Sequence, residues 1–182
     1  MASQADPLMV MEPPTREDME HAIELLHGAC FGWALSCCRG RRDDAEDVLQ
    51  TSYLKALDGR AVFNGSSSAR TFLFGVIRRT ASERRRYDLV RILGRARLEH
   101  DADPGPSDPE SIASDREAHA RLRDVLQRLS HRQRDLLHLV YYQEMTIEEA
   151  SEVLGISLGS ARTHYERGKR RLRALLNGAL HS

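Results

Sequence analysis

The sequence predicts an all-α protein of two small helical domains, and three observations lead to this expectation. Apolar residues recur at helical spacing along several stretches, aromatic residues make up 5%, and β-branched runs typical of strands are absent. Residues 146–176 carry the capping and turn signals of two consecutive helices. An acidic, proline-rich stretch separates two basic stretches, as a linker between domains would. The content of 41% hydrophobic and 30% charged residues is ordinary for such a fold.

Residues 146–176 are interpreted as two helices joined by a tight turn. Thr146 is placed to cap the first helix, and Glu149 would complete a capping box. Gly155 can end that helix in a left-handed conformation, and Ser157 can cap the next helix. In the second helix one seam is apolar and the arginines lie off it. The seam consists of Ala161, Tyr165, Gly168, Leu172 and Leu175. This pattern predicts a helix-turn-helix whose second helix fits the major groove of DNA.

Charge is segregated along the chain, although the formal net charge is zero. Residues 78–97 hold eight arginines and two acids, and residues 162–173 hold six basic residues and one acid. Residues 98–115 hold six acids and neither Lys nor Arg. Two basic blocks separated by an acidic one predict two surfaces that face nucleic acid. Solvated helix faces are the alternative interpretation.

The first long helix is expected to begin after Thr15, with Asp18 completing its cap. Its buried stripe is expected to be Met19, Ile23, Leu26, Cys30, Trp33 and Cys37. Cysteines on an apolar stripe usually act as small core residues. A metal or redox cluster of His27 with Cys30, Cys37 and Cys38 is the alternative, but no second Cys/His pair follows at zinc-site spacing. We therefore expect neither a metal site nor a cofactor.

A second helix is expected after Gly40, capped by Asp43 or Asp44. Its predicted inner face is Ala45, Val48, Leu49, Ser52 and Ala56. Asp44, Asp47 and Gln50 point mostly the other way. They form either a solvated first turn or a polar docking surface for a protein partner.

A third helix is expected to begin near Ala69, after an Asn-Gly turn and a serine cap. It combines aromatic with basic residues, as single-stranded DNA binding requires, because unpaired bases stack on rings and the backbone attracts positive charge. The side chains predicted to do this are Phe72, Phe74, Arg78, Arg79, Arg84 and Arg85. We also expect at least one of the two phenylalanines to lie in the core.

The predicted organisation is a disordered tail over residues 1–14, a first domain over 15–97, a linker over 98–114 and a second domain over 115–182. Within the second domain Ser130 should cap a helix whose core residues include Leu136, Leu137, Leu139, Val140 and Tyr141. No apolar run is long enough to cross a bilayer and the N-terminus lacks a signal-peptide pattern, so we expect a cytoplasmic, nucleoid-associated protein without membrane insertion. Phosphate loops, nucleophile motifs and carboxylate dyads are absent, so an enzyme is not expected.

Three blocks together resemble the extracytoplasmic-function sigma factors, the small two-domain promoter-recognition subunits of bacterial RNA polymerase. Residues 44–50 with 53–56 are similar to the family's polymerase-clamp-binding helix. Residues 71–86 are similar to its promoter-melting segment, and residues 126–176 to its domain that reads the minus-thirty-five element. The resemblance covers roughly Ala22 to Leu176. It implies an all-α fold of a sigma region 2-like bundle and a region 4-like helix-turn-helix bundle.

The resemblance also implies roles for individual residues. Asp44, Asp47 and Gln50 would bind the clamp of the largest polymerase subunit, and the second domain would meet the flap of the second subunit. The residues implied at the minus-thirty-five element are Ser157, Ser160, Arg162, Thr163, Glu166, Arg167 and Arg170, with Arg173 on backbone phosphates. Two positions depart from the family pattern: Arg79 stands where asparagine is common, and Thr51 replaces a common acid. Arg79 therefore puts the minus-ten preference in question.

The function implied is that of a sigma factor that directs core RNA polymerase to specific promoters and opens them. One alternative is a helix-turn-helix regulator that binds DNA without polymerase. Another is a sigma-like decoy that only binds an anti-sigma factor. The expected partners are core RNA polymerase, promoter DNA and an anti-sigma factor that wedges between the two domains or clamps them.

Overall fold

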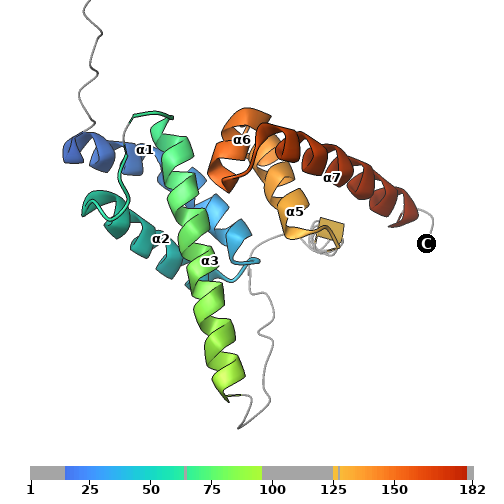
Figure 1. Ribbon diagram of the computed structural model, residues 1–182, viewed down its shortest axis with the longest axis horizontal. Coiled ribbons are helices and arrows are strands. Elements are labelled where there is room, and N and C mark those ends of the chain that lie inside the picture. The colour runs from blue at the N-terminus through green and yellow to red at the C-terminus, as the bar shows by residue number, and fades with distance from the viewer. Residues whose placement is uncertain (1–14, 64, 96–124, 127, 180–182) are drawn as a thin grey trace, which may run out of the picture.

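The computed structural model describes residues 15–63, 65–95, 125–126 and 128–179, and throughout these ranges the regular structure is helical, without strands. The predicted tail and linker lie outside the described residues. All-α architecture is therefore confirmed. Figure 1 shows two groups of helices side by side, with the long helix α3 running past the first group.

The first group is a bundle of α1 (Arg16–Cys37), α2 (Arg42–Leu57) and α3 (Ala69–Arg95), in which each helix packs on the other two. The predicted capping box of Thr15 and Asp18 begins α1, and Ser68 accepts a bond from the Thr71 N–H at the start of α3. The prediction that Asp43 or Asp44 caps α2 is wrong. Arg41 is the N-cap residue and makes no side-chain cap bond, because a guanidinium has no acceptor for a backbone N–H. Asp44 lies inside the first turn of α2, and its carboxylate pairs with Arg41 and Arg84.

The core of the first group forms where the predicted apolar stripes meet. The largest fully buried side chain is Trp33, whose indole Nε1 donates to the main-chain oxygen of Phe74 at 3.0 Å. All three cysteines are buried and unbridged, as expected for Cys30 and Cys37 on the stripe. Burial raises the pKa of the Cys30 thiol to about 11, so it is neutral near pH 7.

The second group contains α5 (His131–Leu137), a π-helical turn η1 (His138–Tyr142), α6 (Ile147–Leu154) and α7 (Leu158–Ala179). Ser130 caps α5 through the Gln133 N–H, as predicted. Leu136 and Leu139 are fully buried, but the expectation that Tyr141 joins them is wrong. The wider turn of η1 rotates Tyr141 outward, where it is 61% exposed and stacks on Tyr165.

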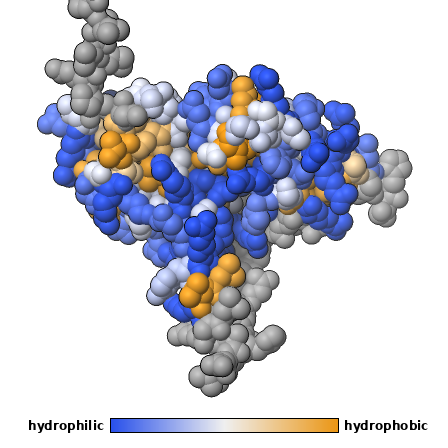
Figure 2. Space-filling model, viewed as in Figure 1, coloured by the Kyte–Doolittle hydropathy of each residue, from blue (hydrophilic) through white to orange (hydrophobic). Residues whose placement is uncertain are grey.

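The two groups share a continuous buried cluster, because α3 packs against α6 and α1 touches η1. Figure 1 shows α6 beside the first half of α3, while the second half of α3 extends away from both groups. Figure 2 shows a mainly hydrophilic surface, with an apolar spot near the end of α3 where Leu89 and Val90 are exposed. None of the described helices is long and apolar enough to cross a membrane.

Candidate nucleic-acid interface

The helix-turn-helix predicted from the sequence is present in the second group. Thr146 and Glu149 form a reciprocal capping box at the start of α6. Gly155 ends this helix with a φ of 60°, a conformation that glycine adopts without the steric cost of a Cβ. The Ser157 hydroxyl accepts the Ser160 N–H at the start of α7. These caps fix the direction in which α7 leaves the turn.

The apolar seam of α7 faces α5 and α6, as predicted. Ala161 and Gly168 are buried, and Tyr165, Leu172 and Leu175 are partly buried. A Cβ at Gly168 would lie 3.3 Å from the Cβ of Gln133, close enough that the Gln133 side chain would have to shift, so glycine suits the close approach of α7 to α5. This close packing holds the opposite face of α7 outward.

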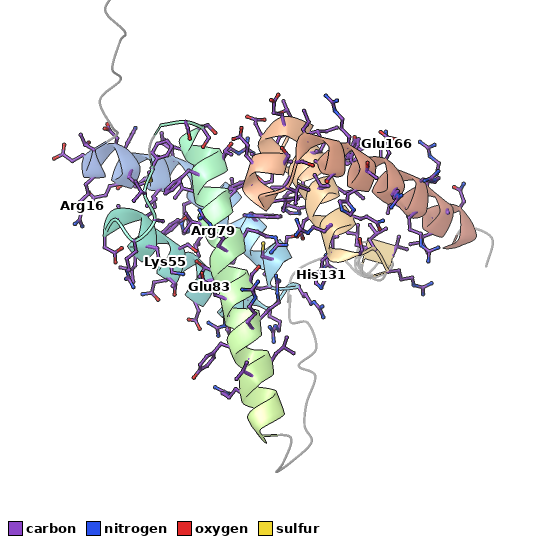
Figure 3. All side chains as sticks on the ribbon, in the orientation of Figure 1. Arg16, Lys55, Arg79, Glu83, His131 and Glu166 are labelled. Atoms are coloured by element: carbon purple, nitrogen blue, oxygen red, sulfur yellow. The ribbon has the colours of Figure 1, made fainter. Side chains whose placement is uncertain are left out.

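The outward face of α7 is the arginine-rich surface. Its exposed members are Arg162, Thr163, Glu166, Arg167, Arg170, Arg171 and Arg173. Figure 3 shows Glu166 on the side of α7 away from α5, and its carboxylate pairs with Lys169 at 3.0 Å. Within the described parts of the chain no carboxylate pairs with any of these arginines. An exposed row of guanidinium groups on one helix suits phosphates and guanine edges in a major groove.

Three of the predicted groove residues have local bonds of their own. The Ser157 hydroxyl donates to the Ser160 hydroxyl at 2.9 Å, and Thr163 Oγ1 donates to the main-chain oxygen of Gly159 at 2.9 Å. All of them nevertheless remain exposed beside Arg162 and Arg167. The structure therefore groups all seven residues predicted for the minus-thirty-five element on the first four turns of α7 and its cap.

On α3 the predicted single-strand residues divide between surface and core. Phe74 is fully buried and stacks on Trp33 with the ring centroids 6.0 Å apart, so its proposed base contact is wrong for this arrangement. This outcome agrees with the expectation that one phenylalanine would be core. Phe72 is partly exposed, and its ring lies 4.9 Å from that of Phe63. Phe63 and Phe72 line a pocket together with Arg79.

The four arginines of α3 predicted to bind single-stranded DNA also divide, and Arg79 is the one of these four whose guanidinium is exposed without a partner outside its own helix. Arg78 forms an ion pair with Asp135 of α5 at 3.0 Å, and both side chains are largely buried. Arg85 donates to the main-chain oxygen of Cys37 at 2.8 Å, which closes the C-terminal end of α1. Arg84 pairs with Asp44 and Asp47. The free DNA contacts predicted for Arg78, Arg84 and Arg85 are therefore not available in this arrangement, because each guanidinium has an internal partner.

The predicted polymerase-docking residues form a strip along α2. Asp47 and Gln50 are exposed, whereas the Asp44 side chain is only 18% exposed and pairs with both Arg41 and Arg84. A groove beside Asp47 runs between α2 and α3. Figure 3 shows Lys55 and Glu83 where these two helices face each other, and their side chains pair at 2.5 Å.

Sequence reasoning missed the contacts between the two groups. Asp135 gave the best available signal, because an acid directly before Leu136 and Leu137 falls where a helix should be buried. Its partner Arg78 was assigned to DNA because it lies in a basic block. Among the described residues no group of His, Cys, Asp and Glu side chains could hold a metal ion.

Comparison with known proteins follows the same division of the chain. Residues 22–88 match the family described as Sigma-70 region 2, and residues 119–172 match Sigma-70, region 4. The RNA polymerase sigma factor YlaC of Bacillus subtilis is 30% identical over 132 residues, which cover 72% of this chain and 76% of that protein. SigZ of the same organism is 36% identical over 66 residues, 36% of this chain and 38% of that one.

Two solved structures share the fold. The sigma factor RpoE in complex with the anti-sigma factor NepR, from Bartonella quintana, gives a TM-score of 0.69 at 22% identity and covers 88% of this chain and 98% of that one. CnrH in complex with the cytosolic domain of CnrY gives 0.62 at 20% identity and covers 90% of each chain. At identities of 22% and 20% the similarity to these two structures shows a shared fold only.

Proposed function

The chain belongs to the sigma-70 family of RNA polymerase sigma factors, and from this premise we propose how its surfaces divide the work of promoter recognition. Helix α7 reads the upstream duplex, α3 with the Phe63 loop holds the unpaired strand, and the outer strip of α2 binds polymerase. Sigma factors are initiation factors rather than enzymes, so these surfaces bind and position without chemistry of their own.

The observation that supports the proposal best is the exposed arginine row of α7. Arg162 and Arg167 lie in the N-terminal half of α7, the part of a recognition helix that reaches base edges. Arg170 and Arg173 lie further along the same face, where phosphate contacts would fix the register of the helix. A sequence-specific contact from Arg162 and register contacts from the later arginines would make α7 the upstream anchor.

The single-strand surface is smaller than the sequence predicted. It combines the partly exposed ring of Phe72 with the exposed guanidinium of Arg79, beside the pocket they share with Phe63. An aromatic floor and a cation at its edge suit an unstacked base and its phosphate. We propose that a base of the minus-ten element enters here, and that Arg79 sets a base preference different from that of asparagine.

The proposed polymerase surface consists of Asp47 and Gln50. Asp44 lies beside them and binds Arg84, which also pairs with Asp47. Asp47 is the exposed end of the Arg84 network, so its carboxylate can exchange an internal partner for a basic group on the polymerase clamp. The second group would meet the flap of the second-largest subunit. We further propose an anti-sigma factor as a partner, because the similar RpoE structure is a complex with the anti-sigma factor NepR. The protein would act in the cytoplasm, on the nucleoid.

Binding of core polymerase separates this proposal from a helix-turn-helix regulator that acts alone. Labelled core polymerase should bind the chain in the absence of DNA, and the complex should select promoter fragments that neither component selects alone. Sequence-specific binding of the chain to duplex DNA without any affinity for core polymerase would instead establish the regulator. Binding of neither DNA nor polymerase would leave the decoy as the function.

A further inference from the structure

A cluster of cationic side chains lies where the end of α1 meets the start of α5. His131, the first residue of α5, lies between Arg39, which follows α1, and Arg134 of α5. Arg85 of α3 adds a third arginine, whose charge acts on both His131 and Arg134. Figure 3 shows His131 where α5 lies beside the first group. None of the contacts proposed above for polymerase or DNA uses this cluster.

Two guanidinium groups flank both ring nitrogens of His131. Nη2 of Arg39 lies 3.0 Å from Nε2, and Nη2 of Arg134 lies 2.8 Å from Nδ1. Partial burial and the charges of Arg134 and Arg39 lower the pKa of His131, so the imidazole is mainly neutral near pH 7. A neutral imidazole accepts at one nitrogen, and a guanidinium only donates. One of the two contacts therefore brings two donors together, and one arginine finds no acceptor on the ring.

Arg134 has a further donor without a partner, because its Nε is buried and makes no hydrogen bond. The neighbouring acid, Asp135, pairs with Arg78 at 3.0 Å. In the ranges that the structure describes, no carboxylate forms an ion pair with Arg39, Arg85 or Arg134. Burial and the charges of Arg39 and Arg85 lower the pKa of Arg134. The cluster thus combines an excess of positive charge with more N–H donors than acceptors.

The backbone holds Arg39 in a fixed position at the end of α1. Its φ is 59°, in the left-handed region that residues with a Cβ rarely adopt and that glycine usually occupies after a helix. The Gly40 N–H donates to the main-chain oxygen of Leu35 at 2.9 Å and closes this turn. Arg85 Nη1 donates to the main-chain oxygen of Cys37 at 2.8 Å, which fixes the last residue of α1 on α3. An arginine held in this strained conformation is a sign of a functional position.

We propose that Arg39 and Arg134 bind a phosphate group between α1 and α5, with Arg85 as a further positive charge. A phosphate offers several acceptor oxygens, so it can accept from both guanidinium groups and from Nε of Arg134, which the single acceptor of His131 cannot do. The planar fork of arginine matches phosphate geometry. The phosphate belongs either to a small free compound, such as inorganic phosphate or a nucleotide, or to the DNA backbone. The site itself does not rest on the proposed function.

Thermal unfolding of the full chain, followed by circular dichroism, tests the site with inorganic phosphate as the probe. The comparison is sodium chloride at equal ionic strength and pH. A ligand that binds only the folded state multiplies the folding constant by one plus the ratio of its concentration to Kd, so phosphate at about ten times its Kd should raise that constant about 11-fold. The midpoint should rise and then level off as binding saturates. Equal midpoints in both salts would overturn the proposal.

Arginine variants separate binding from the general stabilisation that phosphate gives by being excluded from protein surfaces. Arg39→Gln and Arg134→Gln should each lose the saturable rise. Arg16→Gln is the matched control, because Arg16 is an exposed arginine at the opposite end of α1, far from His131 in Figure 3. It should keep the wild-type response. Arginine variants that keep the rise, or a control that loses it equally, would overturn the site. Arg39 is exposed, so its variant keeps the test valid if Arg134→Gln fails to fold.

His131→Glu provides a test in the opposite direction. A glutamate there would place a carboxylate between Arg39 and Arg134 and supply the missing acceptor from within the chain. This variant should therefore have a higher midpoint in chloride than wild type and no saturable response to phosphate. His131→Gln is its uncharged control and should keep the response. A His131→Glu variant that responds to phosphate as wild type does would contradict the proposal.

Two further probes identify the source of the phosphate. Isothermal titration calorimetry with ATP and with a mixed-sequence DNA duplex is carried out on wild type, Arg39→Gln and Arg16→Gln. An affinity for ATP that falls at least fivefold in Arg39→Gln alone would support a free nucleotide. The same pattern for the duplex would support the DNA backbone. Affinities for both probes that Arg39→Gln leaves unchanged would overturn the site.

Discussion

Replacing Asp47 by alanine should separate polymerase binding from folding. The Asp47 carboxylate is 59% exposed and its ion pair with Arg84, at 2.9 Å, lies at the surface, where such pairs contribute about 0–1 kcal/mol. Arg84 also keeps Asp44 as a second partner at 2.9 Å. The free energy of unfolding of Asp47→Ala should therefore fall by less than about 1 kcal/mol. Polymerase affinity should fall by tenfold or more, or about 1.4 kcal/mol, if Asp47 contacts a basic group of the clamp.

Replacing Asp44, on the same helix, should affect the stability of the fold more strongly than replacing Asp47. Its side chain is 18% exposed and pairs with Arg41 at 2.6 Å and Arg84 at 2.9 Å. Its loss removes two bonds between charged groups, each worth about 1.5–3 kcal/mol, and leaves Arg84 with Asp47 as its remaining carboxylate partner. Asp44→Ala should therefore lower the free energy of unfolding more than Asp47→Ala does.

Urea unfolding followed by circular dichroism gives the stability of each variant, and fluorescence polarisation of labelled protein with core polymerase gives its affinity. Glu46→Ala is the matched control, because Glu46 is an exposed acid of α2 that also pairs with an arginine, Arg42, at 2.9 Å. It should lose little stability and no polymerase affinity. Unchanged affinity in Asp47→Ala, or an equal loss in Glu46→Ala, would refute the docking strip.

Three further predictions concern other parts of the chain. Thr146→Ala removes the α6 cap and should lower the free energy of unfolding by about 1 kcal/mol, while Thr146→Ser should retain most of it; an unchanged thermal midpoint would contradict the capping role. Arg162→Ala should lose about 1–3 kcal/mol of discrimination at one upstream base pair in competition binding, whereas equal weakening on every sequence would identify a phosphate contact. Burial raises the pKa values of Cys30 and Cys38 to about 11, so the unfolded chain loses these thiol protons at lower pH than the folded protein does. The free energy of unfolding should therefore fall as pH rises from about 8.5 towards 11. A free energy of unfolding that does not change over this pH range, measured beside Cys30→Ala, would contradict this.

The elements were predictable where local chemistry decides them. The capping box of Thr146 and Glu149, the left-handed Gly155 and the seam through Ala161 and Gly168 all follow from spacing, because caps and helix periodicity act over a few residues. The same local rules predicted an aspartate cap for α2 that the structure does not have. The Asp44 carboxylate pairs with Arg84, which lies 40 residues further along the chain.

The contacts between distant segments were not predictable in this way. Arg78 and Asp135 are separated by 57 residues, and nothing in either local pattern shows that they meet. A basic block looks the same in sequence whether its arginines face DNA or internal carboxylates, and Arg84 and Arg85 turned out to have internal partners. The burial of Phe74 likewise depends on the position of Trp33, which helix periodicity alone does not give.

Runoff transcription by core polymerase on a promoter library measures the proposed function as a whole, because it requires polymerase docking, upstream recognition and strand opening together. The purified chain should direct initiation from promoters that share two sequence blocks at a fixed spacing. Arg162→Ala should relax the upstream block, and Asp47→Arg should abolish the transcripts while the protein stays folded. Undiminished initiation in Asp47→Arg would contradict the proposed polymerase docking surface. Transcripts without a shared upstream block would contradict upstream recognition by α7.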